Sequence, residues 1–64
     1  MPNIIIDGPK IEETEAKRVL VKEITDAVEK AYRLPRMAFV VTIKENLPEN
    51  VGVGGELVID RFKR

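Results

Sequence analysis

One long stretch with helical period, residues 12–32, separates two short runs of apolar, β-branched residues, and this order constrains the fold most. Glu12, Glu13 and Glu15 crowd its expected first turn, where the helix macrodipole favours negative charge. Pro35 ends the helix, because the residue before a proline avoids the α region. Apolar residues recur at spacings of three and four, which predicts an amphipathic helix with one apolar stripe: Ala16, Val19, Leu20, Ile24, Ala27, Val28 and Ala31.

The runs on either side of this helix predict two β-strands. Residues 3–7 contain three consecutive isoleucines, and Gly8 with Pro9 ends the run. In residues 37–44 apolar side chains dominate one face and reach partly onto the other. A strand, a helix and a second strand connect as a right-handed crossover, so the two strands are expected to be parallel.

Behind the second strand the sequence predicts a polar loop, a glycine-rich bend and a short terminal strand or hairpin. The loop covers residues 45–50, the bend residues 52–55 and the strand residues 56–59. Residues 60–64 form a charged tail, in which Phe62 either docks on a neighbour or frays. The glycines neither follow a strand directly nor open a helix, so they do not fit a dinucleotide-binding loop.

The expected fold is a single α/β (α+β) domain over residues 1–64: a β-α-β subunit with parallel strands, one amphipathic helix and a short C-terminal hairpin. The helix covers one face of the sheet, and nothing else in the chain covers the other. A second subunit is expected to cover that face, because exposed apolar surface is costly. Chains this short need additional stabilisation, and a chain without Cys has no disulfide to provide it. The sequence therefore predicts an oligomer.

Composition argues against several classes of function. The 11 basic and 11 acidic residues give zero net charge, whereas a nucleic-acid-binding protein normally carries a basic excess. The chain has neither Cys nor His, so we expect no metal site and no cofactor. No apolar run approaches the ~20 residues of a membrane span, and no signal-peptide pattern opens the chain. We therefore expect a cytoplasmic protein with neither nucleic acid nor membrane as its partner.

Pro2, directly behind Met1, is the first candidate for chemistry. Methionine before a small second residue is normally trimmed, and the product then begins with a rigid secondary amine. An α-amino group titrates near ~8, and desolvation or a nearby cation lowers that value, so the neutral amine is a usable general base near neutral pH. Proline is also harmless as the first residue of a strand, because its missing N–H is not needed there. Both interpretations fit the Met-Pro pair alone.

In this order and at this length, the elements resemble the 4-oxalocrotonate tautomerase family over essentially the whole chain. The resemblance rests on Pro2 behind a removable Met1, the first strand, the helix, Pro35 before the second strand, and the Val-Gly-Val-Gly-Gly-Glu-Leu stretch of residues 51–57. It implies a β-α-β subunit that pairs into dimers with a joined four-stranded sheet, and dimers that assemble into a hexamer. It also implies that the amino-terminal proline is the base that moves a proton between an enol oxygen and a carbon.

The resemblance further implies two arginines and one aromatic residue in the site, and here the sequence differs. The two arginine positions are occupied by Glu12 and Val40, and the aromatic position by Val51. The cation nearest to the first position is Lys10, which is a point charge and does not replace the bidentate fork of arginine. The base is therefore retained, while the carboxylate clamp is expected to be weaker.

Two cations are candidates to bind a substrate carboxylate, Arg36 and Lys10. Arg36 precedes the second strand, and parallel strands start at one edge of a sheet, so Arg36 can lie near Pro2 within one chain. Lys10 lies beyond the far end of the first strand, roughly 20 Å from Pro2 at ~3.3 Å per residue, so it serves that site only from another subunit. Solvated surface roles fit both cations as well. Val40 and Val51 fit a core or an interface as well as the lining of a pocket.

The resulting hypothesis is a keto–enol tautomerase, an isomerase acting on a small 2-hydroxy-alkenoate or similar enol or keto acid within a homo-oligomer, most simply a hexamer. Hydration and dehalogenation are related reactions of the same amine. The alternative is a catalytically silent oligomeric scaffold or binding module with the same fold. Loss of both arginine positions favours the alternative, and retention of Pro2 favours the enzyme. Intact mass discriminates, because with Met1 in place the Pro2 nitrogen is an amide without useful basicity.

Overall fold

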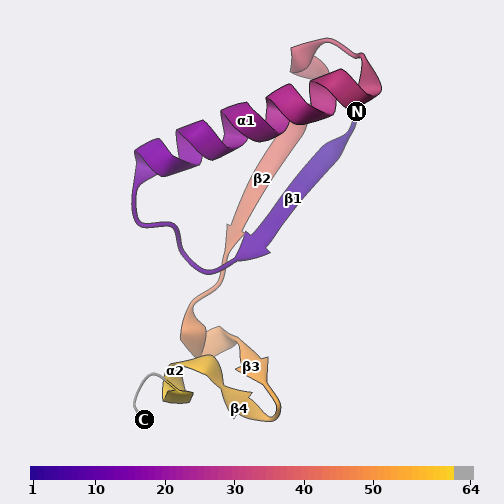
Figure 1. Ribbon diagram of the computed structural model, residues 1–64. Helices are drawn as coiled ribbons and strands as arrows, with labels where there is room; N and C mark the ends of the chain where they lie inside the picture. The colour runs from indigo at the N-terminus through magenta and orange to yellow at the C-terminus, as the bar shows by residue number, and fades with distance from the viewer. Residues whose placement is uncertain (62–64) are drawn as a thin grey trace.

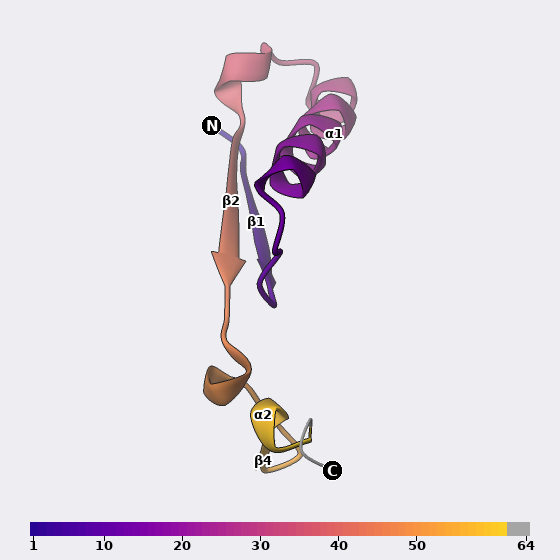
Figure 2. The same cartoon turned by 90° about the vertical axis from the view of Figure 1, so that its left-hand side faces the viewer.

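The computed structural model describes residues 1–61, and its larger part is a β-α-β unit (Figure 1). Strands β1 (Asn3–Gly8) and β2 (Val40–Glu45) pair in parallel, in a register that runs from Asn3 opposite Val40 to Gly8 opposite Glu45. Helix α1 (Thr14–Tyr32) connects them and lies on one side of the two strands (Figure 2). The predicted β-α-β unit with parallel strands is therefore confirmed.

Alternate residues of the strands are shielded on the side of α1. Ile4 pairs with Val41 and Ile6 pairs with Ile43, and these four side chains are half-buried. Thr25 of α1 is the one buried side chain of the described chain, and its hydroxyl donates a hydrogen bond to the Val21 carbonyl at 2.7 Å. The shielded stripe of α1 is narrower than predicted, because the side chains at four of the predicted positions are exposed in the single chain: Ala16, Val19, Ala27 and Ala31.

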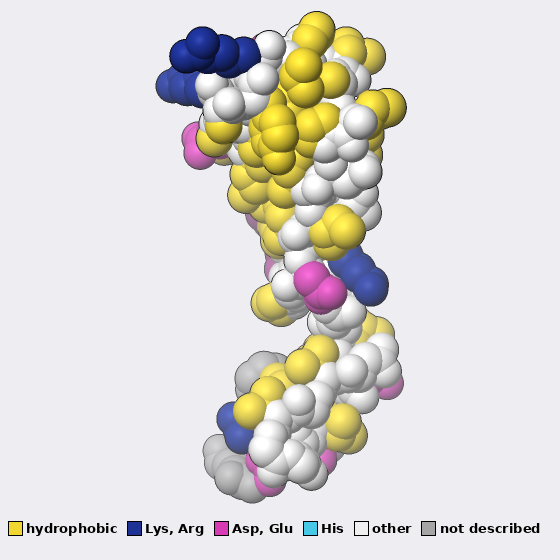
Figure 3. Space-filling model, turned by 90° about the vertical axis from the view of Figure 1, so that its right-hand side faces the viewer, with side chains coloured by type: hydrophobic (Ala, Val, Ile, Leu, Met, Phe, Trp, Pro, Cys, Tyr) yellow, Lys and Arg dark blue, Asp and Glu magenta, His cyan; other side chains and the backbone are white. Residues whose placement is uncertain are grey.

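The opposite face of the sheet is open. Ile5 is 66% exposed and Val40 is 39% exposed, and no hydrophobic side chain of residues 1–61 is fully buried. The radius of gyration is 15.4 Å, whereas a compact domain of this length has a value of about 11 Å. Figure 3 shows hydrophobic side chains gathered over the upper part of the molecule and again along the lower arm. A single chain therefore leaves its apolar surface largely uncovered.

The helix begins two residues later than predicted. Glu13 occupies the N-cap position with extended backbone angles and makes no side-chain cap hydrogen bond, so Glu12 and Glu13 precede α1 and Glu15 is the acidic residue of its first turn. At the other end, Arg33 adopts a left-handed conformation with φ of 57° and donates its N–H to the Glu29 carbonyl at 2.9 Å. This is an αL cap, a common way for a helix to end.

The second strand begins three residues later than predicted. Residues Arg36–Ala38 form a 3₁₀ turn, in which the Ala38 N–H donates to the Pro35 carbonyl at 2.8 Å. The apolar period of residues 37–44 continues through this turn, so side-chain pattern alone does not separate it from a strand.

The chain continues beyond β2 as an arm formed by residues 46–61. A second 3₁₀ turn (Pro48–Asn50) leads to an antiparallel hairpin of β3 (Gly52–Val53) and β4 (Glu56–Leu57), which confirms the predicted hairpin. Gly54 and Gly55 have φ of 61° and 84°, the left-handed pair that a tight hairpin turn requires. The expected strand over residues 56–59 was wrong in its second half, because Val58–Arg61 forms the short helix α2. Phe62 and the rest of the predicted tail lie outside the described residues.

Candidate functional site

Pro2 lies at the amino-terminal end of the sheet. Its carbonyl accepts a hydrogen bond from the Val40 N–H at 3.1 Å, and the next residue, Asn3, is paired with Val40 in the register. Met1 is 81% exposed, and its carbonyl accepts a long hydrogen bond of 3.4 Å from the Asn3 side chain. The backbone of Pro2 is therefore held against the start of β2, while Met1 projects into solvent.

The guanidinium of Arg36 contacts helix α1. One nitrogen lies 2.8 Å from the Asp26 carboxylate and 2.9 Å from the Glu29 carboxylate, and another donates to the Lys22 carbonyl at 3.3 Å. The hydrogen bond with Asp26 is the main cause that raises the pKa of Arg36 above its usual value. Within one chain Arg36 therefore makes three polar contacts to α1, and its predicted role toward substrate stays a prediction.

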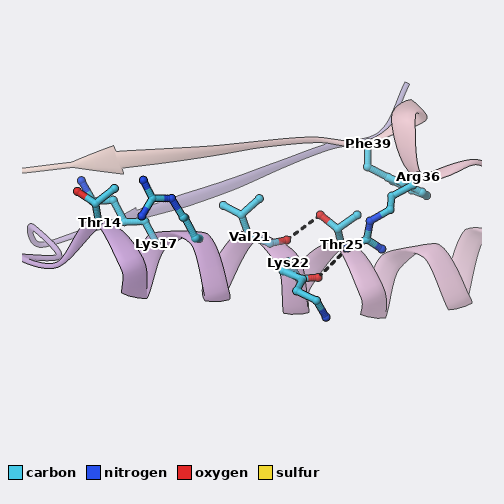
Figure 4. Close-up of a pocket in the computed structure, with 8 residues that line it drawn as sticks. Thr14, Lys17, Val21, Lys22, Thr25, Arg36 and Phe39 are labelled. Carbon is cyan, nitrogen blue, oxygen red and sulfur yellow. Dashed lines mark hydrogen bonds between the residues drawn. The ribbon is translucent and has the colours of Figure 1, made fainter.

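A groove of about 530 Å³ runs beside α1 toward the turn that precedes β2 (Figure 4). Thr25 and Arg36 make their hydrogen bonds to α1 carbonyls within it. Each of its four cations is paired with a carboxylate of the same chain, and the side chains of Arg18 and Lys22 are largely exposed in these pairs. These pairs are Lys17–Glu45, Arg18–Glu15, Lys22–Asp26 and Arg36 with Asp26 and Glu29.

Lys10 and Val51 lie toward the opposite end of the sheet, where β1 and β2 finish. Lys10 follows Gly8 and Pro9, and its ammonium is 4.0 Å from the Glu12 carboxylate in an exposed pair. Val51 lines a mainly apolar groove of about 420 Å³, together with Asp7, Gly8, Pro9, Asn46, Pro48 and Val58. At ~3.3 Å per residue, the six steps from Pro2 to Gly8 place this end of the sheet roughly 20 Å from Pro2.

The five predicted site residues therefore form two groups within one chain. Pro2, Val40 and the Arg36 turn lie at the amino-terminal end of the strands, and Lys10 and Val51 lie at the carboxyl-terminal end. A site that contains members of both groups requires residues from a second chain.

Three polar residues that organise the carboxyl-terminal end of the sheet were not predicted from the sequence: Asp7, Glu45 and Asn46. The Asn46 N–H donates to the Gly8 carbonyl at 2.8 Å, and its side-chain amide donates to the Asp7 carboxylate. Glu45 accepts a hydrogen bond from the Ile11 N–H at 2.8 Å. The only signal in the sequence is the polar pair Glu45-Asn46 at the end of an apolar strand. Its partners lie more than 30 residues away along the chain and follow from the strand register.

Residues 1–61 contain neither a metal-binding cluster nor a membrane-spanning helix. No group of three or more Asp, Glu, His or Cys side chains in this range could hold a metal ion. None of the helices in the same range is both long enough and apolar enough to cross a membrane.

Comparison with known proteins gives one family. The model of a family described as tautomerase enzyme matches residues 2–61. No curated protein sequence matches the chain.

Several solved structures are similar over almost their whole length. DmpI from Archaeoglobus fulgidus is 39% identical, with a TM-score of 0.81 over 92% of this chain and 100% of that one. TomN, a 4-oxalocrotonate tautomerase homologue of the tomaymycin biosynthetic pathway, is 25% identical, with a TM-score of 0.87 over 98% and 97%. A heterohexameric 4-oxalocrotonate tautomerase from Chloroflexus aurantiacus is 25% identical, with a TM-score of 0.81 over 94% and 97%.

Proposed function

Since the chain belongs to the tautomerase enzyme family, we propose that it is a keto–enol tautomerase whose general base is Pro2, exposed by removal of Met1. The observation that carries this proposal is the position of Pro2. The family match begins at this residue, and the Val40 N–H holds the Pro2 carbonyl at the amino-terminal end of the sheet. Met1 projects into solvent, where an aminopeptidase can reach it.

The proposed reaction is a proton transfer within a small enol acid. The lone pair of the neutral proline nitrogen takes the proton from the enol oxygen, and the electrons of that O–H bond form the ketone. The electrons of the carbon–carbon double bond then take the proton back from the prolinium at carbon. General acid–base catalysis of this kind contributes typically ~10²–10⁴-fold. We expect the prolinium to lose its proton below the ~8 of a free α-amino group, because the assembled site would partly desolvate it and place cations near it.

The proposed substrate is a 2-hydroxy-alkenoate with one carboxylate and an apolar body. Val40 and Val51 replace an arginine and an aromatic residue of the family pattern, so they offer apolar lining and no charge. Lys10 is 58% exposed and weakly paired, so its ammonium remains available to a substrate carboxylate in a neighbouring subunit. Arg36 is the second candidate for this role, provided that it leaves its carboxylate partners on α1. Phenylenolpyruvate fits this description, and a distal carboxylate is expected to add little.

The proposed assembly is a homo-oligomer, and a hexamer is the form we expect. Two observations support it: the open apolar face of the sheet around Ile5, and the separation of Lys10 from Pro2 within one chain. The Chloroflexus aurantiacus tautomerase with a similar fold is a heterohexamer. Several subunits together would cover the open face and join the two groups of site residues.

A second function is favoured by the residues at the expected cation positions. Glu12 and Val40 occupy the family's arginine positions, and Arg36 is paired with two carboxylates of its own chain. These features fit an oligomeric scaffold or binding module that keeps the fold without the chemistry.

Kinetics of three forms distinguish the two functions. The first step is to measure the intact mass of the purified protein, which shows whether Met1 is absent. The rate of phenylenolpyruvate tautomerisation is then compared for the trimmed protein, Pro2→Ala, and a form whose amino terminus carries an uncleaved extension. The proposal predicts that both altered forms lose most of the activity while circular dichroism and oligomer mass stay unchanged. Equal rates for the trimmed protein and Pro2→Ala would leave the scaffold as the only reading.

A further inference from the structure

The carboxylate of Glu45 ties the loop between β1 and α1 to the end of β2. One oxygen, Oε2, accepts a hydrogen bond from the Ile11 N–H at 2.8 Å and lies 3.1 Å from the Lys17 ammonium. Glu45 and Lys17 are 27% and 31% exposed, whereas the neighbouring helix pair Arg18–Glu15 is 68% and 73% exposed. The Glu45 contact is therefore the better shielded of the two.

The surroundings of the Glu45 carboxyl favour its ionised form. The hydrogen bond from the Ile11 N–H, followed by that from Lys17, holds the pKa of the Glu45 carboxyl below its usual value, and the charge of Lys10 acts in the same direction. Hydrogen bonds to a charged acceptor are stronger than neutral ones, so the Ile11 amide is held firmly at neutral pH.

The loop formed by residues 9–13 has weak anchors apart from this one. Pro9 has no N–H, and Glu13 makes no side-chain hydrogen bond at the N-cap of α1 in the described chain. Lys10 and Glu12 form a pair at 4.0 Å with side chains 58% and 78% exposed, and exposed pairs of this kind contribute little. The contact between Glu45 and Ile11 therefore sets the path of the loop, and Lys10 is the residue directly before Ile11.

We propose that Glu45 is a positioning residue, which fixes the backbone at Lys10 through the Ile11 amide so that the Lys10 ammonium meets a substrate carboxylate at a neighbouring subunit's Pro2. This inference rests on the proposed function, since it requires Lys10 to bind substrate. A lysine loses much conformational freedom when it binds, and a fixed backbone reduces that cost. Glu45 itself does not touch the substrate. Its loss therefore weakens substrate binding and leaves proton transfer at Pro2 unchanged.

Steady-state kinetics of the trimmed full-length protein on phenylenolpyruvate test this role. Glu45→Ala is expected to raise KM about 3- to 10-fold, since only part of the hydrogen-bond energy lost at the Ile11 amide is felt at the Lys10 ammonium, with kcat changed by less than about 2-fold. Glu45→Gln retains an acceptor for the Ile11 N–H, so its KM is expected to rise less. In a Lys10→Ala background, Glu45→Ala is expected to raise KM no further, because Glu45 acts through Lys10.

Glu15→Ala is the matched control. It breaks an ion pair in the first turn of the same helix without touching the loop, so its KM should equal that of the wild type. Light scattering and circular dichroism establish that each variant is folded and assembled. If Glu45→Ala fails to fold, the comparison of Glu45→Gln with Lys17→Ala decides, because the proposal predicts a KM effect without a kcat effect for both.

The failures of the two proposals differ. Equal rates for the wild type and Pro2→Ala overturn the proposed function, and the role of Glu45 with it. If activity depends on Pro2, either of two results overturns the role of Glu45 and leaves the proposed function in place. The first is an unchanged KM in Lys10→Ala or Glu45→Ala, and the second is a Glu45→Ala effect that is equally large with and without Lys10.

Discussion

Replacing Ile5 by Ser should disrupt the assembly through the open face of the sheet. Ile5 is 66% exposed in the single chain, and its neighbour across the sheet on the same face is Thr42. Full burial of an isoleucine side chain contributes about 1.5–3 kcal/mol, so covering two-thirds of it contributes about 1–2 kcal/mol per subunit. In the two-fold interface that the proposed assembly implies, the two copies together would contribute about 2–4 kcal/mol.

The corresponding loss of affinity is roughly 30- to 1,000-fold in the dissociation constant of the dimer. Sedimentation velocity over a concentration series measures it, and the wild type should give several times 7.3 kDa at micromolar concentration. Glu15→Ala is again a suitable control, because its ion pair is exposed and worth at most about 1 kcal/mol. An Ile5→Ser protein that assembles as tightly as the wild type would refute the argument that this face lies in the interface.

Three further predictions follow from the site and its ion pairs. Mixing Pro2→Ala with Lys10→Ala subunits, after dissociation and reassembly, should yield hybrid sites with the wild-type KM; no recovery would show that the two residues do not share a site. Val40→Arg should lower KM for a dicarboxylate enol about tenfold relative to phenylenolpyruvate, since it would restore the guanidinium at one of the family's two arginine positions; an equal change for both substrates would contradict this. Asp26 and Glu45 have lowered pKa values, because Asp26 accepts hydrogen bonds chiefly from Lys22 and Glu45 chiefly from the Ile11 N–H. Their contribution to stability is therefore complete above pH values near 3.8 and 4.5 and is lost as pH falls through the lower folded values. Glu45→Gln should reduce the acid-induced drop in melting temperature, and an unchanged drop would refute that assignment.

Much of the fold was accessible from the sequence, because periodicity and turn residues act locally. The period of α1, the isoleucines of β1 and the Gly54-Gly55 turn predicted the β-α-β unit and the hairpin. The residues at which the helices and strands begin and end were harder to predict from the sequence. The apolar period of residues 37–44 runs through the Arg36–Ala38 turn, and Val58 begins a helix after a strand of two residues.

The site was accessible only in part, because its contacts depend on register and on other chains. The parallel crossover predicted that Pro2 and Arg36 lie at one end of the sheet and Lys10 beyond the other, and the register has this arrangement. The roles of Glu45 and Asn46 depend on partners far away in the sequence, which no local pattern reveals. The pairing of Arg36 with Asp26 and Glu29 likewise depends on how the turn before β2 approaches α1.

The titration of Pro2 tests the central claim most directly. Protein labelled with ¹⁵N-proline and trimmed of Met1 allows the amino-terminal nitrogen to be followed by NMR across pH, alongside kcat/KM for phenylenolpyruvate. The account predicts one midpoint below the ~8 of a free α-amino group, shared by the nitrogen shift and the rising limb of kcat/KM. A midpoint at or above that value, or a rate limb that does not coincide with it, would contradict Pro2 as the tuned base.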